Sequence, residues 1–143
     1  MKHIMLLPLL LLSLMACGQQ NSSTKNTKTN QNKMNQEEIL KPIKELIDAM
    51  QKEDAARIRA QFSKNATQAY GADGKMKSSE ETKTWIETDI INRKGKLENS
   101  TFDLVSNTEV VVTGQYKSIG YTNKANFLFT VENGLITSWR MRY

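Results

Sequence analysis

The sequence predicts an α+β domain in which three helices come first and an antiparallel sheet follows. Between residues 37 and 92 the apolar residues recur at helical spacing, whereas from residue 97 onwards they alternate as in strands. The closing stretch, Ala125 to Tyr143, consists of two apolar-rich runs around Glu132-Asn133-Gly134 and predicts a β-hairpin. These patterns together favour one compact domain.

The first helix is expected over residues 37–52, because the apolar residues of this stretch fall on one helical stripe. A proline is tolerated only in the first turn of a helix, so Pro42 places the start of regular helix near Lys41 or kinks it there. The stripe consists of Ile39, Ile43, Leu46, Ile47 and Met50.

Capping residues mark the starts of two further helices. Asp54 is a suitable N-cap for a helix over residues 55–62. Ser78 and Glu81 have the spacing of a capping box, which predicts a third helix that ends near Asn92 and buries Trp85.

The remaining segments are expected to be strands. A short strand over residues 66–70 precedes a turn at residues 71–74, and two longer strands follow over residues 97–106 and 109–119.

Two registers are open for the closing hairpin. A two-residue loop pairs Glu132 with Leu135, whereas a three-residue loop with Gly134 as a bulge pairs Val131 with Leu135. We favour the second, because it gathers the apolar side chains on one face and leaves Leu128 and Ile136 on the polar face. The apolar face would hold Ala125, Phe127, Phe129, Val131, Leu135, Trp139 and Met141.

The N-terminus predicts export. Residues 1–16 have a short basic start and an apolar run, as in a secretory signal peptide, and the run is far shorter than the ~20 residues that span a bilayer. Leu14-Met15-Ala16-Cys17 resembles the bacterial lipobox, which implies cleavage before Cys17 and dual acylation of that residue. We therefore expect a protein anchored to the bacterial cell envelope. Gly18, rather than aspartate, after the cysteine favours the outer membrane.

The next segment, residues 17–36, is expected to be a disordered tether, because it is almost wholly polar and cannot bury apolar surface. Residues 37–143 would form the domain.

Composition argues against several classes of function. The net charge of +5 is modest and shows no basic stripe with interleaved aromatics, so we expect no nucleic-acid partner. The single histidine, His3, lies in the signal peptide, which argues against a histidine base in the domain and against most zinc sites. We expect neither a metal nor a cofactor.

Three helices followed by strands that end in F-x-F-x-V-E-N-G-x-I-x-x-W resemble the nuclear-transport-factor-2-like superfamily, in particular its SnoaL-like branch. The resemblance implies a cone-shaped curved antiparallel sheet wrapped around three N-terminal helices, with a cavity between sheet and helices. It also implies a homodimer formed through the outer sheet face. The matching residues are Asp54, Asp73, Gly74, Phe127, Phe129, Val131, Gly134, Ile136 and Trp139.

Candidate site residues follow from this resemblance. Asp89 lies one turn from Trp85 and is the one weak candidate for a catalytic base, although a solvated carboxylate is the simpler interpretation. Tyrosines would donate hydrogen bonds to a ligand or merely pack at the rim, and the tryptophans would stack on a ligand or form core. The expected ligand-binding set is Tyr70, Trp85, Asp89, Tyr116, Phe127 and Trp139.

Three functions remain open on sequence alone. The first is a non-catalytic, membrane-anchored domain that binds a small apolar ligand or a protein partner. The second is a SnoaL-like enzyme, of the isomerase, cyclase or hydrolase type, that transfers a proton through Asp89. The third is a structural or interaction module whose cavity is filled.

Overall fold

The computed structural model describes residues 24–142, and their side chains from Asn35 onwards. The predicted signal peptide, Cys17 and the first part of the predicted tether lie outside the described residues. Within the described part, no helix is both long and apolar enough to cross a bilayer.

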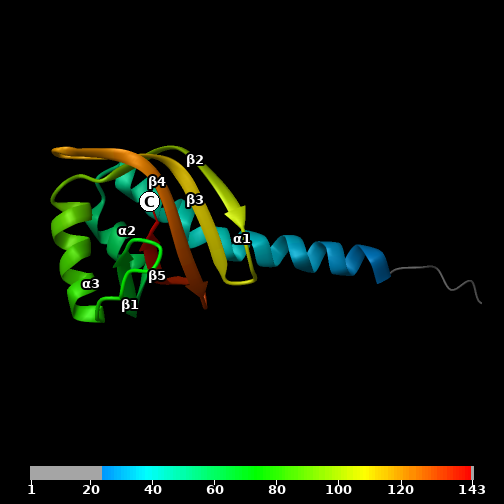
Figure 1. The fold of residues 1–143 in the computed structure, drawn as a ribbon. Coiled ribbons are helices and arrows are strands. Elements are labelled where there is room, and N and C mark those ends of the chain that lie inside the picture. The colour runs from blue at the N-terminus through cyan, green and yellow to red at the C-terminus, as the bar shows by residue number, and fades with distance from the viewer. Residues whose placement is uncertain (1–23, 143) are drawn as a thin grey trace, which may run out of the picture.

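The first helix, α1 (Thr24–Gln51), is longer than the sequence suggested. Its first turns extend beyond the sheet (Figure 1), and they include residues 24–36 of the segment that was expected to be a tether. Pro42 lies inside the helix, and the predicted start near Lys41 was wrong. The apolar stripe further along α1 packs the helix against the sheet. The polar turns before it can then continue the helix through backbone hydrogen bonds alone.

The apolar stripe of α1 packs against the sheet. Ile43, Leu46 and Met50 are almost completely buried, as the periodicity predicted. The chain then turns through Glu53, whose φ is positive, into α2 (Ala55–Ala60), which Asp54 caps as expected. The Asp54 carboxylate accepts from the backbone N–H of Arg57 at 3.0 Å.

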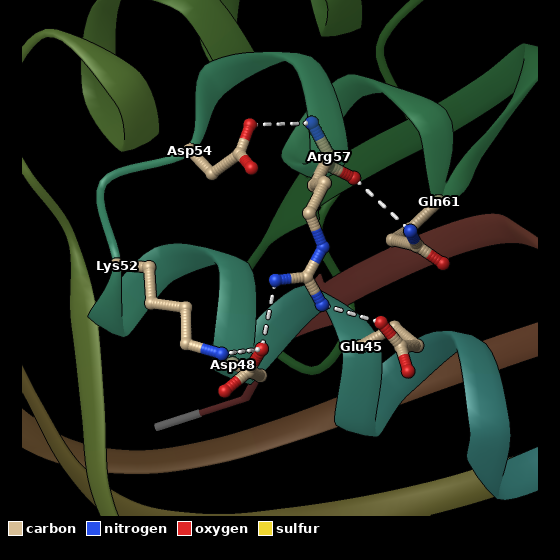
Figure 2. Close-up of polar contacts among 6 residues, drawn as sticks. All are labelled: Glu45, Asp48, Lys52, Asp54, Arg57 and Gln61. Carbon is tan, nitrogen blue, oxygen red and sulfur yellow. Dashed lines mark hydrogen bonds and ion pairs between the residues drawn. The ribbon is translucent and has the colours of Figure 1, made fainter.

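Arg57 ties α2 to α1 (Figure 2). Its guanidinium lies 2.5 Å from a carboxylate oxygen of Glu45 and 2.8 Å from one of Asp48, while Lys52 approaches the same Asp48 oxygen at 2.9 Å. These contacts hold the pKa of Asp48 below its usual range, the Lys52 hydrogen bond being the largest cause and Arg57 the next.

The third helix begins at the predicted capping box. In α3 (Ser79–Trp85), the Ser78 hydroxyl accepts from the Glu81 N–H at 3.3 Å, and the Glu81 carboxylate accepts from the Ser78 N–H at 2.8 Å. The helix continues as a π-helix, η1 (Ile86–Ile91), in which the Asn92 N–H donates to the Glu87 carbonyl. π-Helical turns are rare and frequently occur at functional sites.

The sheet has five strands in the order β1-β5-β4-β3-β2 and is open at both edges. It curves around α1, with α3 beside β1 (Figure 1). β4 pairs antiparallel with both β3 and β5, and β2 pairs antiparallel with β3, whereas β1 joins β5 in parallel. The sheet is therefore mixed: the expected antiparallel pairing holds from β2 to β5, and β1 adds a parallel strand at one edge. The strands are β1 (Phe62–Tyr70), β2 (Lys96–Leu104), β3 (Glu109–Ser118), β4 (Tyr121–Glu132) and β5 (Leu135–Met141).

The closing hairpin adopts neither predicted register throughout. Asn133 and Gly134 both have positive φ and form a two-residue loop, so Glu132 pairs with Leu135. A β-bulge then shifts the pairing between Thr130 and Val131, with Thr137 as the extra residue.

The bulge explains which side chains turn inward. Without it, Ile136 and Trp139 would face opposite sides of the sheet, yet both are buried. The prediction that placed Ile136 on the outer face was therefore wrong, as was the burial predicted for Leu135, which is exposed. The rest of the predicted apolar face is buried: Ala125, Phe127, Phe129, Val131, Trp139 and Met141.

The α+β class is confirmed: helices pack into the concave face of a curved sheet, and one continuous core joins them. The outer face is polar at its centre, where Thr101 and Thr113 share a hydrogen bond of 2.6 Å and Ser138 donates to Thr130 at 2.8 Å. Dimerisation through this face stays a prediction, and Ile136 no longer supports it.

Candidate functional site

A cavity of about 180 Å³ opens between η1 and the sheet. Its walls come from the end of β1, from α3 and η1, and from β3, β4 and β5. All six residues of the predicted ligand-binding set line it: Tyr70, Trp85, Asp89, Tyr116, Phe127 and Trp139. The structure therefore brings together residues that are as far apart in the sequence as β1 and β5.

Aromatic rings form the inner part of the cavity. Trp139 meets Trp85 edge-on, with ring centroids 5.0 Å apart, and meets Phe127 in the same way at 5.2 Å. Tyr116 extends this cluster, with its ring 5.9 Å from that of Phe127. Such edge-to-face contacts hold the rings in fixed positions, so the apolar inner wall is largely preformed.

A hydrogen bond joins two walls of the cavity. The indole N–H of Trp85 donates to the Tyr70 hydroxyl oxygen at 2.6 Å. Burial raises the pKa of Tyr70, and the Trp85 hydrogen bond opposes that rise. Since Trp85 uses only the oxygen, the hydroxyl proton of Tyr70 can be donated to an acceptor in the cavity.

Tyr116 is the more deeply buried tyrosine of the cavity. Burial raises its pKa to about 12, and its hydroxyl donates weakly to the backbone carbonyl of Asp89 at 3.4 Å. Gly95 lies against that hydroxyl, and a Cβ at this position would collide with it. Tyr116 is therefore a neutral hydrogen-bonding group whose position depends on a glycine.

Asp89 reaches the cavity from the π-helix, but its carboxylate is neither buried nor free. Its side chain is 38% exposed and lies 3.7 Å from the Arg93 guanidinium, and it accepts from the Thr88 hydroxyl at 2.7 Å. Arg93 also donates to the Ile119 carbonyl at 2.9 Å, which joins η1 to the β3–β4 turn at the rim.

Several lining residues were not predicted. The rim adds Arg93, Ser118, Asn123 and Lys124, and Lys124 forms no ion pair with any described residue. Nothing in the local sequence marked them, because they approach the cavity only through the pairing of β3 with β4 and the end of η1. The inner wall adds Ile90 and Met141, and Tyr121 completes the tyrosines that line the cavity.

Metal-binding groups are sparse. Among residues with described side chains, no three carboxylate, histidine or cysteine groups lie close enough to hold an ion. The cavity itself contributes a single carboxylate, which its arginine already contacts.

No protein-family model matches the sequence, and no characterised protein matches it in sequence. Solved structures match in shape. A nuclear-transport-factor-2-like protein of unknown function from Cytophaga hutchinsonii is 20% identical, with a TM-score of 0.59 over 72% of this chain and 87% of that chain.

Two further structures of similar shape are of mycobacterial proteins. A Mycobacterium tuberculosis protein in complex with estradiol-17β-hemisuccinate is 19% identical, with a TM-score of 0.60 over 74% of this chain and 93% of that one. A Δ5-3-ketosteroid isomerase from a Mycobacterium species is 16% identical, with a TM-score of 0.58 over 74% and 92%. At these identities the likeness concerns the fold, and the described domain has the nuclear-transport-factor-2-like fold.

Proposed function

We propose that this protein is a non-catalytic, lipid-anchored binding domain of the bacterial cell envelope, and that its cavity holds a small, mainly apolar ligand. The observation that carries the proposal is the cavity, which combines an aromatic inner wall with tyrosine hydroxyls and a charged rim. Ligand sites are typically concave and apolar, with a few polar groups that orient the ligand.

The size of the cavity limits the ligand. Its volume of about 180 Å³ is below the ~300–1,000 Å³ that is typical of sites for drug-sized molecules. The similar proteins named above include one that holds a steroid ester, but a four-ring molecule exceeds this volume. We infer a ligand with one ring or a short chain.

The polar groups suggest where the ligand's own polar atoms lie. Tyr70 can donate its hydroxyl proton to a carbonyl or ether oxygen, and Lys124 has its charge free of any described ion pair. A ligand with an apolar body, one acceptor oxygen and a weakly anionic end would use all of these features. A structural module with a filled cavity would have no use for them.

A proton-transferring enzyme is the second candidate. One observation favours it: Asp89 and the hydroxyls of Tyr70 and Tyr116 line the same cavity. Against it, the Asp89 carboxylate is solvated and contacts Arg93, whereas a general base must approach a substrate proton directly. Turnover of a bound compound that Asp89→Asn abolishes, in a variant that still folds, would establish the enzyme instead.

Tryptophan fluorescence offers a direct test of binding, since the two tryptophans of the chain both line the cavity. Titration with single-ring amphiphiles such as 4-propylphenol should quench the emission saturably, whereas estradiol should not. Ser118→Phe, which fills the mouth, should abolish the quenching, and Thr122→Phe, at an exposed position of the neighbouring strand, should preserve it. Equal quenching in both variants would refute binding in this cavity.

The proposed lipid anchor in the cell envelope can be tested separately. Cys17→Ser removes the thiol that the lipobox resemblance implies is acylated, so the protein should move from the membrane fraction to the soluble fraction on centrifugation. A variant that still sediments with membranes would contradict the lipid anchor without affecting the cavity.

A further inference from the structure

A second hollow, of about 310 Å³, lies between the end of α2, the first half of β1 and the α3–η1 helix, and shares no lining residue with the cavity. We name it the basic groove. It is lined by Arg59, Phe62, Ser63, Lys64, Ala66, Thr82, Lys83, Ile86 and Glu87.

The groove exists because β1 leaves the sheet for part of its length. Phe62 pairs with Ile136 and Thr67 with Ser138, so the four residues from Ser63 to Ala66 stand opposite the single residue Thr137. Such a bulge bends the strand and leaves its backbone unpaired locally. β1 is also an edge strand, so no other strand covers this segment.

The charge around the groove is predominantly positive. The Arg59 guanidinium donates to both carboxylate oxygens of Glu87, at 2.5 and 2.8 Å. These contacts hold the pKa of the Glu87 carboxyl below its usual range. Lys83 contacts only the exposed Glu80, a pair of small energetic value. Lys64 forms no ion pair with a described residue. Two cations therefore remain available to an anion.

A buried hydroxyl without a partner also lines the groove. Thr84, on the same helix, donates its hydroxyl proton to the Glu80 carbonyl one turn back, at 3.1 Å. The Thr82 hydroxyl makes no such bond, although Thr82 is only 1% exposed. A buried polar group that lacks a partner destabilises the fold, so a ligand atom that forms a hydrogen bond with it gains affinity.

A second buried polar side chain without a hydrogen-bond partner lies on β1. Ala66 lines the groove, and Gln68, two residues on, projects from the same face of β1. Gln68 is completely buried, and both its amide nitrogen and its amide oxygen lack partners. The walls of the groove at Phe62 and Ile86, by contrast, are apolar.

We propose that the basic groove is a second binding site, for a small organic acid. The carboxylate of the acid lies against Lys64 and Lys83, its apolar body against Phe62 and Ile86, and an oxygen at its far end pairs with Thr82. Because the two sites share no lining residue, this proposal does not depend on a ligand in the cavity.

Three matched probes test the parts separately, with the chain from Gly18 onwards, which contains the whole described core. 4-Hydroxybenzoate has both the charge and the far oxygen, 4-hydroxybenzamide lacks the charge, and benzoate lacks the oxygen. In NMR titrations at low salt, 4-hydroxybenzoate should bind about tenfold more tightly than either of the others, since each loses one polar contact. Its shifts should centre on Ser63–Ala66 and Thr82.

Variants identify the groups involved. Lys64→Ala with Lys83→Ala should weaken 4-hydroxybenzoate about tenfold and leave 4-hydroxybenzamide unchanged, because only the former is charged. Lys41→Ala removes an exposed lysine of α1 that lines neither hollow, and it should leave 4-hydroxybenzoate binding unchanged. Thr82→Val should reduce 4-hydroxybenzoate to the affinity of benzoate without lowering the melting temperature, because it removes a hydroxyl that has no partner.

Several results would overturn the proposal. These are no binding of any probe at millimolar concentration, equal affinities for the three probes, or shifts that centre on Trp85 and Tyr116 in the cavity. A loss of binding in Thr82→Val that comes with a lower melting temperature would indicate a purely structural threonine. The fluorescence titration with 4-propylphenol tests the cavity separately, so a failure of the groove proposal leaves that test in place.

Discussion

Replacing Tyr70 by phenylalanine removes one hydroxyl from the cavity wall and leaves the ring in place. That hydroxyl is the acceptor for the indole N–H of Trp85, at 2.6 Å. Trp85 is 4% exposed, so in the variant its N–H is buried and loses the only partner it has among the described residues. Because the ring of Tyr70 is retained, the change isolates the hydrogen bond from packing.

The size of the effect follows from how easily water reaches the indole. A fully buried donor without a partner costs about 1–3 kcal/mol. Tyr70 itself is 44% exposed, so water from the cavity mouth can partly replace its hydroxyl, and the lower end of that range applies. We expect a loss of about 1 kcal/mol, equivalent to a fall of about 4 °C in melting temperature for a domain of this length.

Thermal unfolding followed by circular dichroism measures this difference. Tyr121→Phe is the matched control, because Tyr121 lines the same cavity but its hydroxyl accepts only from Asn123, at 3.1 Å and in an exposed position. The control should shift the melting temperature by less than about 1 °C, as is usual for surface changes.

A double-mutant cycle makes the reasoning refutable. In a Trp85→Phe background there is no indole N–H to leave unpaired, so Tyr70→Phe should then cost almost nothing. An equal cost in both backgrounds would show that the Tyr70 hydroxyl stabilises the fold by some route other than Trp85. A fall no larger than that of the Tyr121→Phe control would show that the hydrogen bond between Trp85 and Tyr70 contributes little stability, contrary to the prediction.

Three further predictions concern local features. The unfolding free energy should fall between pH 10 and 12, because the raised pKa of Tyr116 means that the unfolded chain releases this proton first, and Tyr116→Phe should flatten that fall in an alkaline denaturation series. Gly95→Ala should destabilise the domain by about 1 kcal/mol in urea unfolding, since its Cβ pushes against the Tyr116 hydroxyl, and the loss should disappear in a Tyr116→Phe background. Asp54→Ala should cost about 1 kcal/mol through loss of the α2 cap, whereas Asp54→Asn should retain most of the stability; equal losses would contradict the capping role.

Local sequence patterns predicted the helix starts well. Asp54 and the Ser78–Glu81 pair act through side chains that bond to the backbone three residues away, so the sequence contains everything that such a cap needs. The apolar stripe of α1 is a similar case. Its early start at Thr24 could not be read in the same way, because the added turns carry no apolar stripe.

Pairing between distant segments was harder to predict. The register of the closing hairpin was argued from one face of one hairpin, but Ile136 and Trp139 are both drawn inward by a core to which α1 and β1 also contribute. The bulge at Thr137 satisfies both demands. The parallel alignment of β1 with β5 likewise depends on how α3 returns the chain, which no short pattern in β1 records.

The candidate site likewise contains some residues that the sequence predicted and others that it did not. Aromatic residues were predicted because large rings are conspicuous and the family resemblance places them near a cavity. The charged rim was missed, since Arg93 and Lys124 look like ordinary surface residues until η1 and β4 bring them to one opening. The basic groove was missed for a similar reason, because it arises from a bulge in β1.

The described side chains nearest the start of α1 and the opening of the cavity lie at opposite ends of the sheet. Asn35 and Ile39 lie beside the turns at Asn107 and Gly134, at one end of β3 and β4, while the cavity opens near Ser118, at the other end. A ten-residue strand separates these ends, a distance of roughly 30 Å. This end of α1 is therefore remote from the opening, so a ligand could enter or leave the cavity without approaching Asn35 or Ile39.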